Sequence, residues 1–236
     1  MLLPREHGAY GQLLFPLAAA LLVGHPSGGA WLLAAAALGA FLAHEALLVV
    51  LGQRGSRASR EQGREAKQSL ALFGGFAVVT GVVALSVLPA SALPSLLAPA
   101  LFAGLTGVAV VTHRERTTVG EMLVGVALAS VCVPVALAGA VPTVAVRTLF
   151  LVFSTVFVTA TLGVRAMIGQ VTKRPDAPRP VVAVVATLVL LGALAGLALR
   201  GVVVPRAPVS ALPVALVALV LARRPPQPKH LRIVGW

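Results

Sequence analysis

Apolar residues fill this chain in eight long runs, and the short segments between them hold most of its Pro and charged residues. A run of about 20 apolar residues crosses a hydrocarbon layer of about 30 Å as a helix. The runs are rich in Ala and Leu and do not alternate between polar and apolar positions, so they favour helices over barrel strands. The pattern predicts an all-α polytopic membrane bundle of eight spans, at roughly 10–24, 30–51, 69–88, 95–112, 119–140, 144–168, 181–199 and 204–222.

Composition agrees with a membrane protein. Hydrophobic residues make up 58% of the chain, charged residues 11%, and the mean hydropathy is +0.96, all outside the range of soluble domains. The net charge of +12 does not indicate nucleic-acid binding, because the cations sit between the runs and aromatic residues are scarce. No cleavable signal peptide is expected, and the lone Cys132 excludes a disulfide framework.

The distribution of Lys and Arg predicts the orientation. If the N-terminus is inside, 15 of the 19 cations fall on the cytoplasmic side, and Arg165 lies within a run. The outer side then receives only Arg147, Arg200 and Arg206. This asymmetry predicts a protein of the cell membrane with both termini in the cytoplasm.

Two connecting segments on the predicted cytoplasmic side, 52–68 and 169–180, are longer than the others. We expect the first to be a short helix or an ordered loop at the level of the lipid headgroups, where its excess positive charge suits anionic lipid. The second is turn-like, and ordinary positive-inside loops are the alternative for both. The whole chain, 1–236, is expected to form one membrane domain with a possible pseudo-repeat of 1–112 and 113–222, and with 223–236 as a cytoplasmic tail.

Ionisable residues inside the spans are the strongest site candidates, because each costs a few kcal/mol in a bilayer. His44 and Glu45 lie about 10 Å below the cytoplasmic end of the second span. Glu45 therefore needs a cation or a hydrogen-bond partner. Arg165 is the first candidate, and Arg5 and His7 are the others. A structural ion pair that locks two helices is as compatible with the pattern as a ligand-binding or catalytic role.

The first dozen residues also carry unusual polarity. Pro4 and Glu6 suit the first turn of a helix, whereas His7 with Gly8 and Gly11 is not explained by capping. We expect the two glycines to allow the close approach of another helix or a ligand. A second helix start, at Thr118 and Glu121, fits a capping box in which the carboxylate returns to the backbone of the cap.

All these groups fall on the cytoplasmic side and predict a polar pocket there, walled by apolar helices. The candidate ligand-binding residues are Arg5, His7, His44, Glu45 and Arg165, and the secondary or helix-capping candidates are Glu6, Thr118 and Glu121. No Asp-rich magnesium motif, paired haem histidines, nucleotide loop or activated nucleophile is apparent, so no metal, cofactor or catalytic residue is assigned.

Four stretches resemble the YwiC-like family of bacterial integral membrane proteins. They are Pro4-Arg5-Glu6-His7-Gly8-Ala9-Tyr10-Gly11, Gly120-Glu121, Val164-Arg165-Ala166-Met167-Ile168 and Lys229-His230-Leu231-Arg232-Ile233-Val234-Gly235-Trp236. Tyr10 stands where the family pattern has Trp. The resemblance implies a membrane location and carries no activity with it. The plan of two four-helix halves is similar, as a looser fold analogy, to UbiA-type intramembrane prenyltransferases, but His44-Glu45 and Arg165 stand where those enzymes have acidic motifs.

Three functions are compatible with the sequence. The first is binding of, or action on, a lipid, isoprenoid-like molecule or anionic amphiphile in the cytoplasmic pocket. The second is a small proton-coupled transporter gated by His44 and Glu45, which needs polar groups that continue to the outer face. The third is a structural or assembly factor of a membrane complex. The lipid bilayer is the one partner that the sequence predicts. The sequence does not indicate an oligomeric state.

Overall fold

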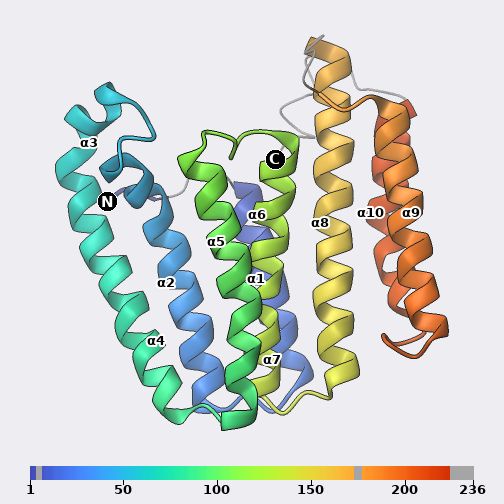
Figure 1. Cartoon of the computed structure of the whole chain (residues 1–236), viewed down its shortest axis with the longest axis horizontal. Helices are drawn as coiled ribbons and strands as arrows, with labels where there is room; N and C mark the ends of the chain where they lie inside the picture. The colour runs from blue at the N-terminus through green and yellow to red at the C-terminus, as the bar shows by residue number, and fades with distance from the viewer. Residues whose placement is uncertain (4–6, 173–176, 224–236) are drawn as a thin grey trace.

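The structure is a computed structural model of the chain and describes residues 1–3, 7–172 and 177–223, apart from the side chains of His7 and Ala222. Within those residues every regular element is a helix (Figure 1). A π-helical turn, Leu70–Gly74, joins α3 to α4, and a 3₁₀ segment, Ala90–Leu96, leads into α5. The α-helices are α1 (His7–Val23), α2 (Gly28–Val50), α3 (Ser56–Ser69), α4 (Gly75–Val87), α5 (Leu97–Val111), α6 (Thr118–Ser130), α7 (Cys132–Ala138), α8 (Thr143–Thr172), α9 (Pro180–Leu199) and α10 (Ala207–Arg223).

The described helices confirm the all-α membrane bundle, and each of the eight predicted spans corresponds to a continuous helical rod. Three rods are composite, because α3 continues into α4, the 3₁₀ segment continues into α5, and α6 continues into α7. Among the described residues, six rods are long and apolar enough to cross a membrane, and α1 and α10 are shorter apolar helices. The segment predicted as a short helix or ordered loop is α3, a polar helix with an amphipathic sequence.

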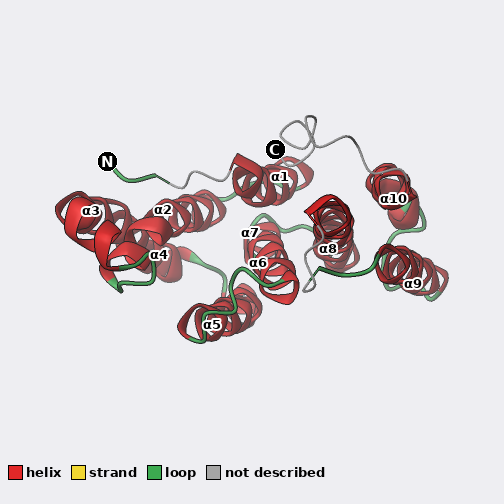
Figure 2. Ribbon diagram, turned by 90° about the horizontal axis from the view of Figure 1, so that it is seen from above, coloured by secondary structure: helices red, strands yellow, loops and turns green. Residues whose placement is uncertain are grey.

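The rods run alternately up and down, so that α1 begins and α10 ends at the same end of the bundle (Figure 1). We call this the basic end, because it holds α3, the turn between α2 and α3, and the loop between α5 and α6. The sequence predicts that it faces the cytoplasm. Seen from above, the helices form an elongated layer, with α2, α3 and α4 at one side and α9 and α10 at the other (Figure 2).

Local chemistry accounts for two of the three composite rods. Pro134 cannot donate a backbone hydrogen bond to residue 130, and α6 gives way to α7 at Val131, one turn before it. The π-helical turn lies where polar α3 becomes apolar α4, and there α2 comes very close. A Cβ on Gly39 of α2 would lie 3.1 Å from the Phe73 carbonyl oxygen, so a glycine allows this approach.

The largest apolar cluster joins α1, α2, α4 and α7 towards the end opposite the basic end. Its buried members include Leu33 of α2, Leu88 after α4 and Val135 of α7. The turn between α1 and α2 is also hydrogen-bonded to the end of α7. The His25 amide donates to the Gly139 carbonyl over 3.0 Å, and the Ser27 hydroxyl donates to the Ala138 carbonyl over 2.8 Å. At this end, α1, α2, α4 and α7 are therefore joined by both apolar packing and hydrogen bonds.

Candidate functional site

Glu45, the acid expected to need a cation, forms a two-pronged ion pair with Arg54. Arg54 Nε donates to Glu45 Oε1 over 2.8 Å, and Nη2 donates to Oε2 over 2.6 Å. The turn after α2 makes this possible, because Gly52 and Gly55 have φ values of +74° and +89° that favour glycine. The chain reverses there and brings Arg54 back beside the helix that carries Glu45. Both side chains are about one-fifth exposed.

The expected pairing of Glu45 with Arg165 is not the one in the structure. Glu45 binds Arg54, and Arg165 of α8 binds Glu121 of α6. The physical reason is that each acid pairs with the cation that the chain or a neighbouring helix brings closest to it. Arg54 follows Glu45 by nine residues across a tight turn, and α8 packs directly against α6.

The Arg165 guanidinium fixes the start of α6. Its Nε donates to Glu121 Oε2 over 2.7 Å, its Nη2 contacts Glu121 Oε1, and Nη2 also donates to the Arg116 carbonyl over 2.6 Å. Glu121 is therefore occupied by an ion pair and does not act as the capping-box acid. The cap itself is Thr117, one residue before the predicted Thr118, and its hydroxyl accepts from the Gly120 amide over 3.1 Å. The cap lies earlier because Thr118 already has helical geometry.

The α5–α6 loop passes over the first turn of α6 at Gly120. A Cβ there would lie 2.2 Å from the Arg114 carbonyl oxygen and 2.6 Å from the Glu115 carbonyl oxygen. A glycine is therefore required for the loop to reach this position. The loop brings Glu115 Oε1 to 3.5 Å from Arg54 Nη1 and 3.9 Å from Arg116 Nε. Glu45 and Arg165 do not pair with each other. The α5–α6 loop and the start of α6 nevertheless place them in one series of polar contacts.

That series crosses the basic end from α2 to α8. We call it the charge chain, and its members in order are Glu45, Arg54, Glu115, Arg116, Arg165 and Glu121. Arg54 and Glu115 were not singled out from the sequence. Gly52 and Gly55 on either side of Arg54 signal a reversal of the chain, but the sequence does not show which acid the reversal faces.

The remaining sequence candidates are placed only in part. Arg5 and Glu6 lie outside the described residues, as does the side chain of His7, the first residue of α1. His44 is exposed on α2 beside Glu45. Among the described residues, a Cβ on Gly8 would meet open space, and one on Gly11 would meet Phe15 of the same helix. The two glycines therefore do not mark the close approach of another described helix. Tyr10 instead packs edge-on against Phe41 of α2, with ring centroids 5.0 Å apart.

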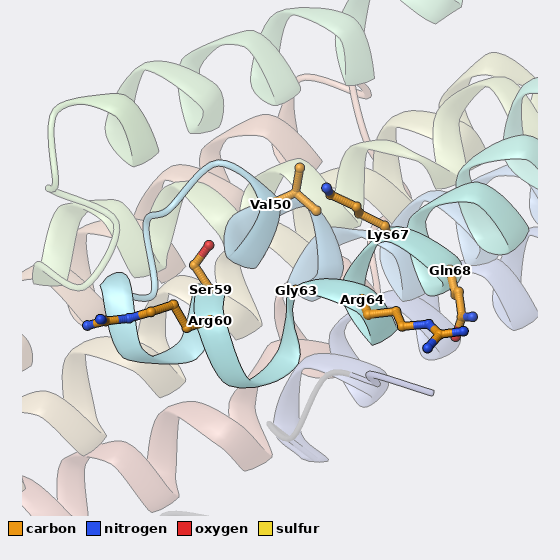
Figure 3. A pocket seen from close by; sticks show the side chains of 7 residues that line it. All are labelled: Val50, Ser59, Arg60, Gly63, Arg64, Lys67 and Gln68. Atoms are coloured by element: carbon orange, nitrogen blue, oxygen red, sulfur yellow. The ribbon is translucent and has the colours of Figure 1, made fainter.

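A pocket of about 530 Å³ lies between α3 and the end of α2. Its cations share one face of α3, because Arg60, Arg64 and Lys67 are spaced by four and three residues. Figure 3 shows Lys67 reaching toward Val50, whereas Arg64 extends away from Val50 toward Gln68 and Arg60 extends in the direction opposite to Arg64. We call this the α3 pocket. Its lining residues, none of which is acidic, are Val50, Ser59, Arg60, Gly63, Arg64, Lys67 and Gln68.

Neither acid of α3, Glu61 or Glu65, lines the pocket. Glu61 is paired with Arg57, four residues earlier, over 2.8 Å at the exposed surface. Neither residue lines the pocket. Gly63 lies in the middle of the cationic face, and a Cβ on it would meet open space. The α3 pocket is therefore an open, positively charged depression beside apolar helices, which is the chemistry expected for an anionic group at a membrane surface.

The fold and this basic end together define a multi-pass helical membrane protein. The family model described as YwiC-like protein matches residues 3–137, more than half of the chain, and the chain belongs to that family. The matched stretch contains the polar residues of the first dozen and the Gly120-Glu121 start of α6, and it ends before Arg165 and the closing residues 229–236. No curated protein and no solved structure matches the chain, so the analogy to UbiA-type prenyltransferases stays an analogy.

Proposed function

We propose that this protein binds an amphiphile with an anionic headgroup at its basic end, and that the α3 pocket is where the headgroup lies. The observation that carries the proposal is a pocket wall with three cations and no carboxylate. Each Lys or Arg near a membrane surface contributes about 1 kcal/mol of attraction to anionic lipid. The volume of about 530 Å³ falls within the usual range for small-molecule sites.

The surroundings of the pocket also suit an amphiphile. The π-helical turn and α4 continue from α3 as an apolar rod whose side chains are mostly exposed, including Leu72, Val79 and Val83. A headgroup beside α3 would leave its acyl or isoprenoid chains against this apolar surface. Neither chemistry nor transport is required for such binding, and the proposal extends to neither.

Glu45 has a supporting role in the proposal. It holds Arg54 in the turn that leads into α3, and so it positions the pocket without lining it. Arg165 acts in the same way on the α5–α6 loop. In this proposal Glu45 and Arg165 are positioning residues, and the headgroup ligands are Arg60, Arg64 and Lys67.

The test compares two variants that each lose three cations. One carries Arg60→Gln, Arg64→Gln and Lys67→Gln in the α3 pocket. The other carries Arg147→Gln, Arg200→Gln and Arg206→Gln, all exposed and at the opposite end. Each protein is placed in nanodiscs containing equal amounts of phosphatidylglycerol and phosphatidylcholine, and the lipids retained on release are measured by native mass spectrometry.

We expect the unmodified protein to retain phosphatidylglycerol in preference to phosphatidylcholine. In the pocket variant, the ratio of retained phosphatidylglycerol to phosphatidylcholine should fall by about tenfold or more, given the contribution of each cation. The matched variant should keep it. Equal loss in both variants would show attraction by net charge alone, and an unmodified protein without the preference would also overturn the proposal.

A further inference from the structure

Helices α2, α3 and α4 form a group that is joined to the rest of the bundle differently at its two ends. Towards the opposite end, Leu33 and Leu88 are buried with Val135 of α7 in the large apolar cluster. The Ser27 hydroxyl bond to the Ala138 carbonyl reinforces this junction. Such contacts depend on close packing and hold the helix ends in place.

At the basic end, the buried apolar contacts of the group are within the group and with the N-terminal residues, whose Leu2 amide also donates to the Ser69 hydroxyl over 2.9 Å. The buried cluster there consists of Ala46, Val49 and Ala66, with Leu2 and Leu70 packed against it. These residues belong to α2, α3, the π-helical turn and the N-terminal residues. The contact from this end to the α5–α6 loop is ionic, between Arg54 Nη1 and Glu115 Oε1 at 3.5 Å.

That ionic contact is built to be weak. The Arg54 fork is directed at Glu45, at 2.6 and 2.8 Å, so Glu115 receives only the remaining nitrogen at a longer distance. Glu115 also faces Arg116 at 3.9 Å. A second pocket of about 250 Å³, lined by Gln53, Arg54, His113, Glu115 and Arg116, opens on the contact and gives water and salt access to it. Solvated ion pairs of this kind contribute about 0 to 1 kcal/mol and are screened by salt.

We propose that the Arg54–Glu115 contact is a latch between the α2–α4 group and the α5–α6 loop. The apolar junction at the opposite end is the hinge about which the group moves when the latch opens. Arg54 remains bound to Glu45 in both states, so it moves with α2. This inference does not depend on what occupies the α3 pocket.

The experiment measures distances between spin labels at the two ends of the group in a Cys132→Ala background, which removes the lone cysteine. One pair of labels, at Ser56 and Val119, spans the latch. The other pair, at Val87 and Val144, spans the hinge end. Pulsed electron paramagnetic resonance then gives a distance distribution for each pair. Glu115→Gln opens the latch, and Glu61→Gln is the matched control because Glu61 pairs with Arg57 inside α3.

We expect Glu115→Gln to lengthen and broaden the Ser56–Val119 distribution and to leave the Val87–Val144 distribution unchanged. Glu61→Gln should change neither. The unmodified latch in 1 M salt should shift in the same direction as Glu115→Gln, because the screening length falls to about 3 Å. This salt measurement decides the matter if Glu115→Gln does not fold. An unchanged Ser56–Val119 distribution in both conditions, or an equal change at both ends, would overturn the latch.

Discussion

Helices α8 and α10 pack through small side chains, whereas α2, α3 and α4 meet the rest of the basic end through charged ones. On α10, Ala211, Ala215 and Ala218 are buried on one face. Gly163 of α8 lies against that face so closely that a Cβ on it would be 2.9 Å from the Ala218 Cβ. On the other side, Glu45, Arg54 and Glu115 make the corresponding junction.

The two junctions differ in side-chain type because one is surrounded by lipid and the other lies near the membrane surface. Lipid gives helices no hydrophobic drive to associate, so α8 and α10 depend on the close approach that small residues allow. Near the membrane surface, water screens ionic contacts, and these can exchange partners at low cost. One side of the bundle is therefore suited to a fixed arrangement and the other to a changeable one.

The family match falls unevenly across the two sides. Residues 3–137 include α1 to α6 and all but the last residue of α7, and with them Glu45, Arg54, Glu115 and Glu121. Helices α8 to α10 lie beyond the match. Arg165 is the member of the charge chain that comes from the unmatched side, through its bonds to Glu121 and the Arg116 carbonyl.

The largest effect is expected where the charged side depends on backbone geometry. Gly120→Ala would place a methyl group 2.2 Å from the Arg114 carbonyl oxygen, which no side-chain rotation relieves. The loop must move, and Glu115 moves with it away from Arg54. We expect a loss of about 3 kcal/mol in the free energy of unfolding, measured by thermal denaturation in detergent.

Gly107→Ala on α5 is the control, because a Cβ there meets open space among the described residues. Its effect should be neutral or stabilising, since alanine has the higher helix propensity. Equal stability of the two variants would show that the loop does not lie on α6, and the charge chain would lose its central segment.

Much of the fold follows from the sequence because the membrane allows few alternatives. Apolar runs long enough to span a bilayer must form helices, and all eight predicted runs do so within the described residues. The sequence also predicts α3 as a short helix or an ordered loop, because its charges and their spacing suit a membrane surface. What the pattern did not predict is where rods are interrupted. The π-helical turn at Leu70–Gly74 lies against Gly39, a residue of another helix.

The site was predicted less completely, because pairing between charges depends on which helices are neighbours. The sequence correctly indicates that Glu45 needs a cation, yet the partner is Arg54 rather than Arg165. Three features decide this, namely the turn at Gly52 and Gly55, the packing of α6 on α8, and the close approach at Gly120. The first has a visible signal in the sequence; the other two are properties of the assembled bundle.

A smaller effect is expected on the side joined by small residues. Gly163→Ala brings a Cβ to 2.9 Å from the Ala218 Cβ and 3.1 Å from its Cα, so α8 and α10 must separate slightly. We expect a loss of about 1.5 kcal/mol by the same denaturation measurement. Gly192→Ala on α9, where a Cβ meets open space among the described residues, should cause no loss.

A second substitution sharpens this result. Ala218→Gly removes the methyl group that faces Gly163, so the double variant Gly163→Ala with Ala218→Gly should recover most of the lost stability. The recovery is a coupling energy between two touching residues. If the double variant is as unstable as the sum of the single ones, the small-residue junction between α8 and α10 is not the cause.

The smallest effect concerns Arg165, where the two sides meet. Arg165→Lys keeps the positive charge but loses the planar fork that serves Glu121 and the Arg116 carbonyl together. About 1 kcal/mol should be lost, the net contribution of one hydrogen bond. Arg147→Lys, at the exposed opposite end of the same helix, should have no effect. The Arg165→Lys loss should persist in 1 M salt, because a hydrogen bond to a backbone carbonyl is not an ion pair. A loss that disappears at high salt would mean that Arg165 acts by its charge alone. The contact between the two sides of the bundle would then be entirely ionic.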